Sequence, residues 1–232
     1  MTPQAAYTTK TCCAADAGNG ALESLQAAFQ QGDVIQITDF IDGALAETLA
    51  SRAVEMVDGH GIKRDGYPKR GGRSLHAILD GFVVDKHFRE LAEIYDRARA
   101  LAEAVVQKDV VLSPHQRSGV NIRVYRGAES EDGWHYDSNP LSALLYLTNG
   151  GQPTQFQVTE SSLMDIYPRA GTLLLFEGRS KLHHVPKGSE LRVTCPLNLY
   201  YVTDLARPDR VDQVLFENSD GMKRSAGESG LS

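Results

Sequence analysis

The feature that most constrains the fold is a change of pattern near Ser118. Before it, long stretches such as residues 88–106 carry apolar residues at helical spacing. After it, short apolar or alternating segments follow one another and are separated by Gly or Pro. Closely spaced short strands are typical of a double sheet, and helices that precede them brace it. The sequence therefore predicts an α+β domain with a jelly-roll-like core behind N-terminal helices.

The expected elements divide the 232 residues into three parts. Residues 1–20 show no periodicity, so we expect a disordered N-terminal segment. Residues 21–204 are expected to form one domain, with helical support in 21–117 and the sheet core in 118–204. Residues 205–232 are expected to be a tail. Helices are predicted at residues 21–31, 44–57 and 88–106, and strands at 34–37, 119–125, 141–147, 155–158, 171–176, 183–185 and 191–202.

Two local signals refine this prediction. Asp42 precedes the second helical stretch and is a suitable N-cap, because its carboxylate can accept from the first free backbone N–H groups. Residues 63–73 combine Gly with Lys and Arg, which favours a loop. That loop could be a basic lid over an anionic substrate or a solvated connection, and the sequence leaves both open.

Composition and charge narrow the class of protein. The formal charge is −6 without blocks of either sign, which argues against nucleic-acid binding. The longest apolar runs are far too short to cross a bilayer, and the N-terminus lacks the pattern of a signal peptide. Three cysteines, two of them adjacent, are typical of reduced thiols. These observations favour a cytoplasmic enzyme, and they leave its oligomeric state open.

Metal-ligating residue types recur at informative spacing in the second half of the chain. His135 and Asp137 are two apart, so on a strand their side chains point to the same face. His183 and His184 come about fifty residues later, and Arg192 follows them. Two His and one carboxylate form the ligand set of non-heme Fe(II) oxygenases, which leaves positions open on the metal. An arginine fork is suited to a carboxylate ligand.

These residues resemble the Fe(II)- and 2-oxoglutarate-dependent oxygenases, specifically the branch that looks like prolyl 4-hydroxylases. The resemblance covers residues 121–201 and rests on the order His-x-Asp, His and Arg, with Tyr-containing strands on either side of the His-x-Asp motif. It implies a double-stranded β-helix, which is a jelly-roll or cupin-like core. It also implies an oxidoreductase that binds iron, 2-oxoglutarate and dioxygen, with ascorbate as a candidate reductant.

The resemblance also assigns expected roles to single residues. His135, Asp137 and His183 would hold Fe(II), and Arg192 would bind the far carboxylate of 2-oxoglutarate. Tyr146 and Thr194 are candidate hydroxyl donors to that carboxylate, and Tyr125 would lie nearer the carboxylate that chelates the iron. The site residues implied by the resemblance are His135, Asp137, His183 (alternative His184), Arg192, Tyr125, Tyr146 and Thr194.

Two questions remain open at this level. His183 follows a Leu as in the family's motif, which favours it as the second histidine ligand, and its neighbour His184 is the alternative. Neighbours on a strand face opposite ways, so only one of them reaches the metal. The reaction implied is hydroxylation of a small molecule, such as an amino acid or a biosynthetic intermediate. A peptidyl hydroxylase, a desaturase or cyclase with the same iron centre, and a non-catalytic binding protein are the alternatives.

Overall fold

The computed structural model describes residues 7–14, 19–69, 72–204 and 222–224, the side chains of residues 62–73 and 222–224 excepted. Its helices are α1 (Asn19–Gln30), α2 (Gly43–His60), α3 (Gly81–His87), α4 (Glu90–Val106), α5 (Gln116–Gly119) and the 3₁₀ turn η2 (Val202–Asp204). Its strands are β1 (Thr9–Cys13), β2 (Val34–Thr38), β3 (Ile62–Lys69), β4 (Gly72–Leu79), β5 (Val110–Leu112), β6 (Ile122–Tyr125), β7 (Ser130–His135), β8 (Leu141–Tyr146), β9 (Thr154–Thr159), β10 (Ser162–Ile166), β11 (Leu173–Glu177), β12 (His183–Gly188), β13 (Arg192–Tyr201) and β14 (Met222–Arg224).

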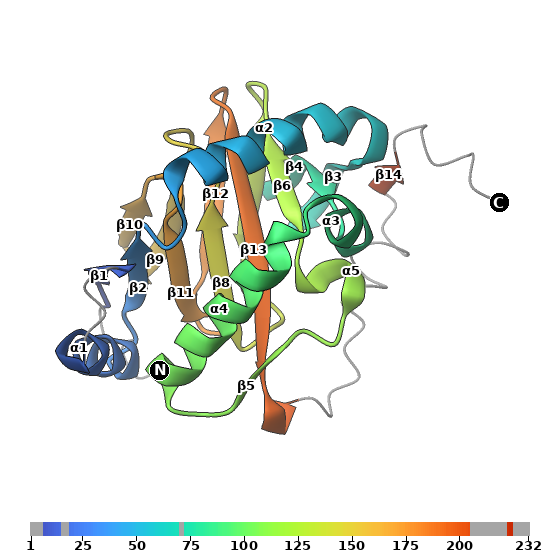
Figure 1. The fold of residues 1–232 in the computed structure, drawn as a ribbon. Coiled ribbons are helices and arrows are strands. Elements are labelled where there is room, and N and C mark those ends of the chain that lie inside the picture. The colour runs from blue at the N-terminus through green and yellow to red at the C-terminus, as the bar shows by residue number, and fades with distance from the viewer. Residues whose placement is uncertain (1–6, 15–18, 70–71, 205–221, 225–232) are drawn as a thin grey trace.

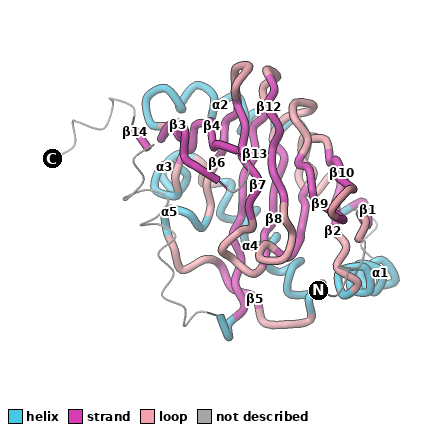
Figure 2. The backbone as a smooth tube through the Cα atoms, turned by 180° about the vertical axis from the view of Figure 1, so that it is seen from behind, coloured by secondary structure: helices cyan, strands magenta, loops and turns pink. Residues whose placement is uncertain are grey.

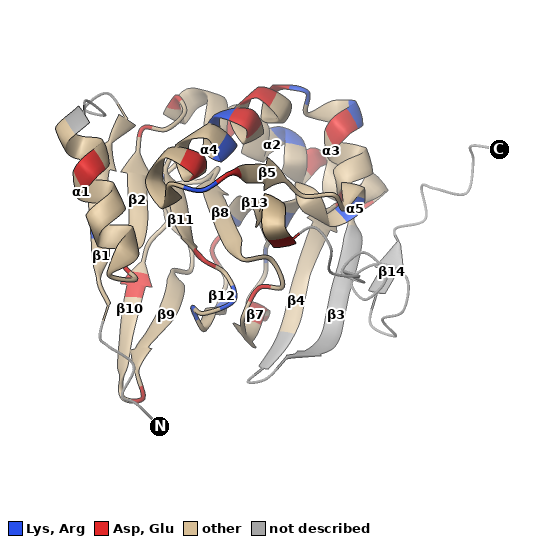
Figure 3. Ribbon diagram, turned by 90° about the horizontal axis from the view of Figure 1, so that it is seen from below, with Lys and Arg blue, Asp and Glu red and all other residues tan. Residues whose placement is uncertain are grey.

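The strands form one curled sheet that folds over on itself. Its strand order is β1-β2-β11-β8-β13-β6-β4-β7-β12-β9-β10, with β3, β5 and β14 paired at its side. Strand β4 joins the two layers because it pairs with β6 through Ile78 and with β7 through Ser74. The helices lie along the layer that contains β8, β11 and β13, whereas β7, β9 and β12 lie on the far side (Figures 1, 2 and 3).

Alternation along the strands separates a dry outer face from a polar inner face. On β13, Val193, Cys195, Leu197 and Leu199 are fully buried in the core beneath the helices. The residues between them, from Arg192 to Asn198, point into the space between the two layers. Each large aliphatic side chain buried in this way contributes roughly 1.5–3 kcal/mol. The helix-facing core therefore anchors the strands whose other face carries the polar groups.

The helices form where the sequence predicts them. Asp42 caps α2 by accepting a hydrogen bond from the Leu45 backbone N–H at 3.0 Å. Helix α2 buries Leu49, Ala53 and Val57 against the sheet, and α4 buries a similar apolar stripe. The α+β architecture and the double-stranded β-helix core are thereby confirmed. Among the described residues, no helix is long and apolar enough to cross a membrane.

Three expectations about the ends and the basic segment are wrong. Residues 9–13 form β1, which pairs in parallel with β2, so the N-terminal 20 residues are not disordered throughout. Tyr7 is buried, and the backbone of Thr8 bonds to Asp33 and Val34. Strand β1 is ordered by its pairing with β2, and a search for periodicity within residues 1–20 cannot detect such a partner. Residues 1–6 and 15–18 lie outside the described residues.

Residues 63–69 and 72–73, predicted as part of a loop, belong instead to β3 and β4, which pair antiparallel, and residues 70–71 lie outside the described residues. The pairing of β4 with β6 and β7 stabilises this pair of strands across long sequence separations, which a composition rich in Gly and basic residues does not reveal. The predicted C-terminal tail also contributes a strand, since β14 pairs with β3. The rest of that tail lies outside the described residues.

Candidate functional site

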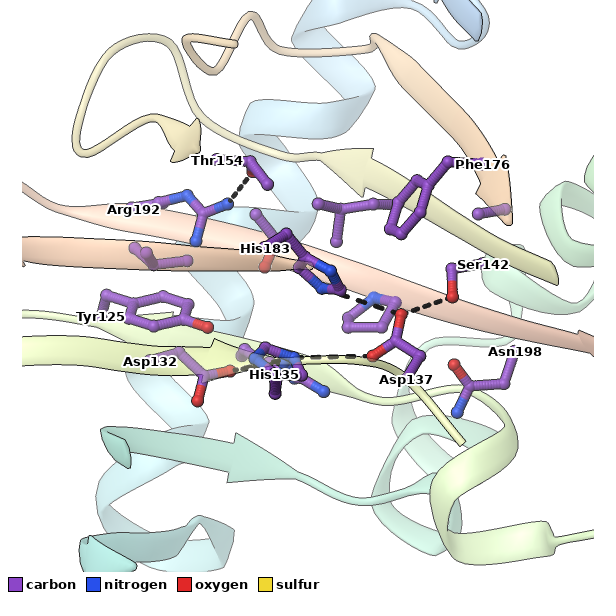
Figure 4. A pocket seen from close by; sticks show the side chains of 16 residues that line it. Tyr125, Asp132, His135, Asp137, Ser142, Thr154, Phe176, His183, Arg192 and Asn198 are labelled. Carbon is purple, nitrogen blue, oxygen red and sulfur yellow. Dashed lines mark hydrogen bonds and ion pairs between the residues drawn. The ribbon is translucent and has the colours of Figure 1, made fainter. Parts of the chain in front are cut away.

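The inner face of the sheet holds a polar pocket. It is lined from four consecutive inward positions of β13 and from β6, β7, β8, β9, β11 and β12 (Figure 4). The lining residues are Arg123, Tyr125, Asp132, His135, Asp137, Ser142, Ala143, Leu144, Thr154, Phe176, His183, Val185, Arg192, Thr194, Pro196 and Asn198. Charged groups in a space enclosed by a hydrophobic core require partners or ligands, so this pocket is the candidate functional site.

Three of these residues form a compact cluster at one end of the pocket. His183 on β12 lies opposite His135 on β7 in the antiparallel register, and Asp137 follows two residues after β7 ends. The Nε2 atom of His135 lies 3.5 Å from one Asp137 oxygen, and the Nε2 atom of His183 lies 3.8 Å from the other. The potential ligand atoms all lie within 4.8 Å of one another. This is the grouping that a single metal ion requires.

The backbone holds both imidazoles in the same orientation. The Nδ1 atom of His135 lies 2.8 Å from the Gly133 carbonyl oxygen, and that of His183 lies 2.8 Å from the Lys181 carbonyl oxygen. A carbonyl can only accept, so Nδ1 carries the proton in the neutral ring and Nε2 keeps its lone pair. Phe156 and Phe176 pack against the His183 ring at centroid distances of 5.6 and 5.1 Å. Both rings therefore direct the lone pair of Nε2, the atom that can bind a metal, toward Asp137.

Asp137 is held as a carboxylate by its neighbours. Burial alone would raise the pKa of Asp137, but the imidazoles of His183 and His135 and the hydroxyl of Ser142 outweigh burial and hold that pKa well below its usual value. Ser142 donates to the carboxylate and in turn accepts from the Asn139 side chain at 2.8 Å. Gly178 packs so closely that an added Cβ would lie 2.6 Å from the Asn139 carbonyl oxygen and 2.5 Å from the Ser142 hydroxyl.

His184 faces the opposite side of β12. Its ring stacks on Trp134 with a centroid distance of 3.7 Å, and its Nε2 atom lies 2.6 Å from the side-chain oxygen of Gln155. Burial, together with the nearby His135, lowers the pKa of His184 to about 4. The structure thus groups His183, rather than His184, with His135 and Asp137.

Arg192 occupies the other end of the pocket and is 1% exposed. Its Nη2 group donates to the Thr154 hydroxyl at 2.7 Å. Among the described residues, its Nε and Nη1 atoms are buried without a hydrogen-bond partner. A buried guanidinium with free N–H groups carries a large desolvation cost, so this end of the pocket is suited to a carboxylate.

The expected tyrosine and threonine residues take different positions around Arg192. Tyr125 and Thr194 line the pocket, and the guanidinium carbon of Arg192 lies 4.9 Å from the centre of the Tyr125 ring. Tyr146 does not line the pocket, and its hydroxyl bonds to Thr154 at 2.7 Å and to the Ile166 carbonyl at 3.3 Å. Thr154, which the sequence analysis omitted, is the hydroxyl group nearest Arg192 in the described contacts.

Sequence reasoning also missed the charged pair beside His135. Arg123, two residues before Tyr125 on β6, bonds to Asp132 at 2.9 Å. Both residues line the pocket. The signal for Asp132 was weak because β7 carries an extra residue between Asp132 and His135, relative to β12, so that two residues three apart share one face. His76 on β4 stacks on Tyr125, with the two ring centroids 4.7 Å apart.

Comparison with known proteins supports the fold. The epimerase SnoN of nogalamycin biosynthesis, described as non-heme and α-ketoglutarate dependent, matches with a TM-score of 0.63 and 18% identity over 92% of this chain and 97% of that one. The carbocyclase SnoK of the same biosynthesis matches with a TM-score of 0.63 and 13% identity over 91% of this chain and 95% of that one. This chain has the fold of the 2-oxoglutarate and iron-dependent oxygenases.

A prolyl-4-hydroxylase of Pseudomonas putida also matches, with a TM-score of 0.56 and 16% identity over 78% of this chain and 98% of that one. No protein-family model and no curated protein sequence match the chain. The expected double-stranded β-helix is thus confirmed by structures that share little sequence with it. The activity has to be argued from the pocket, since folds host many functions.

Proposed function

We propose that the protein is an Fe(II)- and 2-oxoglutarate-dependent dioxygenase that hydroxylates an unactivated C–H bond of a small molecule. The observation that carries this proposal is the pairing of two sites in one pocket. His135, Asp137 and His183 converge at one end, and Arg192 has buried N–H groups without partners among the described residues at the other. A metal site alone would leave the arginine without a role.

The metal-binding end fits Fe(II). Two neutral imidazoles and one ionised carboxylate would hold the ion on one face and leave the opposite positions open to other ligands. Zn(II) accepts the same ligand types. The buried arginine in the same pocket favours the iron reading, because it provides for an anionic co-substrate as well as for the metal.

The arginine end fits 2-oxoglutarate. Arg192 would bind the carboxylate far from the metal through its Nε and Nη1 groups, and Thr154 fixes the guanidinium from the side. Thr194 and Tyr125 line the space between the two ends, where they would contact the co-substrate. Tyr146 would act through Thr154 rather than by direct contact. This assignment changes the sequence-based role of Tyr146 from donor to support.

When iron and 2-oxoglutarate are bound, they supply the chemistry that couples decarboxylation of the co-substrate to succinate and CO₂ with oxidation of a substrate C–H bond. The protein holds the ligands in place, supports the ionised form of Asp137 through the hydrogen bond from Ser142, and covers the His183 ring with Phe156 and Phe176. Asp137 occupies the carboxylate position, which favours hydroxylation over halogenation.

The substrate class is a small molecule, with a peptide as the alternative. The compact domain offers no added recognition module among its described residues, and SnoN and SnoK, which it resembles, belong to nogalamycin biosynthesis. SnoN is an epimerase and SnoK a carbocyclase, so desaturation or ring closure with the same centre is the second candidate reaction. The prolyl 4-hydroxylase similarity supports the peptide alternative.

The test is release of CO₂ from carbon-1-labelled 2-oxoglutarate by the purified protein with Fe(II), ascorbate and air. Panels of small amino acids, polyketides and proline-containing peptides would be added in turn. We expect a small molecule to stimulate release and succinate formation, and the Asp137→Ala variant to show neither. Retained succinate production by that variant would refute the ligand assignment. Stimulation by peptides alone would show that the substrate is a peptide rather than a small molecule.

A further inference from the structure

A second carboxylate lies beside the proposed metal ligands. Asp132 lines the pocket, is completely buried, and has an oxygen 3.9 Å from the Nε2 atom of His135. The extra residue on β7 turns both side chains to the same face. Asp132 does not belong to the cluster formed by His135, Asp137 and His183.

Both oxygens of Asp132 are engaged by neighbouring strands. Ser74, which is opposite Asp132 in the register of β4 and β7, donates its hydroxyl to Oδ1 at 2.5 Å. Arg123 on β6 donates from Nη1 to Oδ2 at 2.9 Å. Figure 4 shows the Asp132 carboxylate next to the His135 ring and below Tyr125. The three strands that meet at this corner of the sheet therefore each contribute one member of the network.

An uncompensated carboxylate at this place would harm the proposed function in two ways. Carboxylate oxygens are good ligands for divalent metals, so a free Asp132 would compete for a position that an exogenous ligand needs. Its negative charge would also repel the dianionic co-substrate across a short distance in a poorly screened pocket. The pairing with Arg123 cancels the charge, and the two hydrogen bonds fix the carboxylate away from the metal.

We infer that Arg123 and Ser74 are positioning residues that hold Asp132 off the metal and so keep the centre open to an anionic ligand. This inference rests on the proposed function, because it presumes a metal at His135, Asp137 and His183. In this view, the Arg123–Asp132 pair controls how many protein ligands the metal can have. The pair is distinct from Arg192, whose guanidinium bonds to Thr154 at the other end of the pocket.

The test uses Co(II) and 2-oxoglutarate as probes and requires no substrate. Co(II) affinity and visible spectrum, and then 2-oxoglutarate affinity for the Co(II) form, would be measured for the unmodified protein, Arg123→Met, Asp132→Asn and the double variant. Arg126→Met is the matched control, because Arg126 is exposed and pairs with Asp58. Removing one charge from a short-range pair in a partly screened site changes affinities by about tenfold.

We expect Arg123→Met to bind Co(II) about tenfold more tightly, to change its spectrum toward a higher coordination number, and to bind 2-oxoglutarate about tenfold more weakly. The double variant should return all three properties to those of the unmodified protein. Asp132→Asn should bind 2-oxoglutarate at least as tightly as the unmodified protein, and this comparison decides the matter if Arg123→Met does not fold.

The outcomes separate the two levels of the argument. If the unmodified protein does not bind Co(II), the proposed metal centre fails before the variants are compared. If it binds Co(II) and 2-oxoglutarate but the double variant is as impaired as Arg123→Met, the loss is structural and the inference is overturned. Weaker 2-oxoglutarate binding by Asp132→Asn would overturn it as well.

Discussion

The two ends of the pocket are built by different means. At the metal-binding end, His135 and His183 are oriented by carbonyl groups two residues before them in the chain. At the other end, Arg192 is fixed by Thr154, which is 38 residues away in sequence. The ring orientations at one end therefore rest on short-range backbone contacts, whereas the guanidinium at the other end is fixed by a contact between strands that are distant in the chain.

Because the two ends are built differently, substitutions at each end should change different binding properties. Substitution near the metal should change metal binding first, because its donors are held locally and point at one position. Substitution around Arg192 should leave the metal bound and weaken only the co-substrate, because no described contact joins Arg192 to the three ligands. Variants at each end can therefore show whether metal binding and co-substrate binding are independent.

The largest effect is expected for Asp137→Ala. The variant removes the only carboxylate of the three-ligand cluster and leaves two neutral imidazoles, so Fe(II) affinity should fall by more than about a hundredfold. Metal binding would be measured by competition with a coloured chelator, and circular dichroism would check the fold. Asp165→Ala changes an exposed carboxylate and is the control. Unchanged affinity in the Asp137 variant would place the metal elsewhere.

Arg192→Met should lower the affinity for 2-oxoglutarate by about a hundredfold, which is the scale for removal of one partner of a buried charge pair. Its Fe(II) affinity should stay the same. Without ligand, the variant should unfold at the same temperature as the unmodified protein or higher, because it removes a buried guanidinium with unpartnered N–H groups. Calorimetric titration and a thermal melt measure the two properties. A parallel loss of Fe(II) would mean that the two ends are coupled.

Ser142→Ala is expected to lower the affinity for Fe(II) about tenfold. The serine donates to Asp137 and links it to Asn139, and loss of such an outer hydrogen bond typically costs 10–100-fold in metal affinity. The same chelator competition would detect the change, and 2-oxoglutarate affinity of the metal-loaded variant should be nearly unaffected. If co-substrate binding falls more than metal binding, the assignment of Ser142 to the metal-binding end is wrong.

The smallest pair of effects distinguishes Thr154 from Tyr146. Thr154→Val removes the hydroxyl that accepts from Arg192, so 2-oxoglutarate should bind about tenfold more weakly, the scale of one buried hydrogen bond. Tyr146→Phe removes the hydroxyl contacts of a residue that does not line the pocket, to Thr154 and to the Ile166 carbonyl, and should weaken binding less. Titration of both metal-loaded variants gives the ranking. A larger loss for Tyr146→Phe would restore the direct contact that the sequence analysis expected.

The comparison also shows what the sequence could predict. The Leu-His motif of the resembled family, together with alternation on β12, favoured His183 over His184, and His183 is the one that lies with His135 and Asp137. Helix α2 was predicted from its apolar spacing and from Asp42. In each case the information lies within a few residues of the chain, where period and capping act.

The parts that escaped prediction depend on distant pairing. Strand β1 forms because the edge of β2 is open to it, and β4 forms because β3 pairs along one of its edges while β6 and β7 share the other. Thr154 and Asp132 were missed for the same reason. Thr154 lies one residue before the predicted strand 155–158 and meets Arg192 38 residues later, and Asp132 precedes an irregularity of β7 that breaks strict alternation.

The most direct test of the account is an anaerobic titration of Fe(II) into the metal-free protein with 2-oxoglutarate, followed by visible absorption. The chelate of 2-oxoglutarate on a protein-bound iron gives a weak charge-transfer band. We predict this band for the unmodified protein and for His184→Ala, and its loss for His183→Ala. Absence of the band in the unmodified protein, or its loss only in the His184 variant, would contradict the site described here.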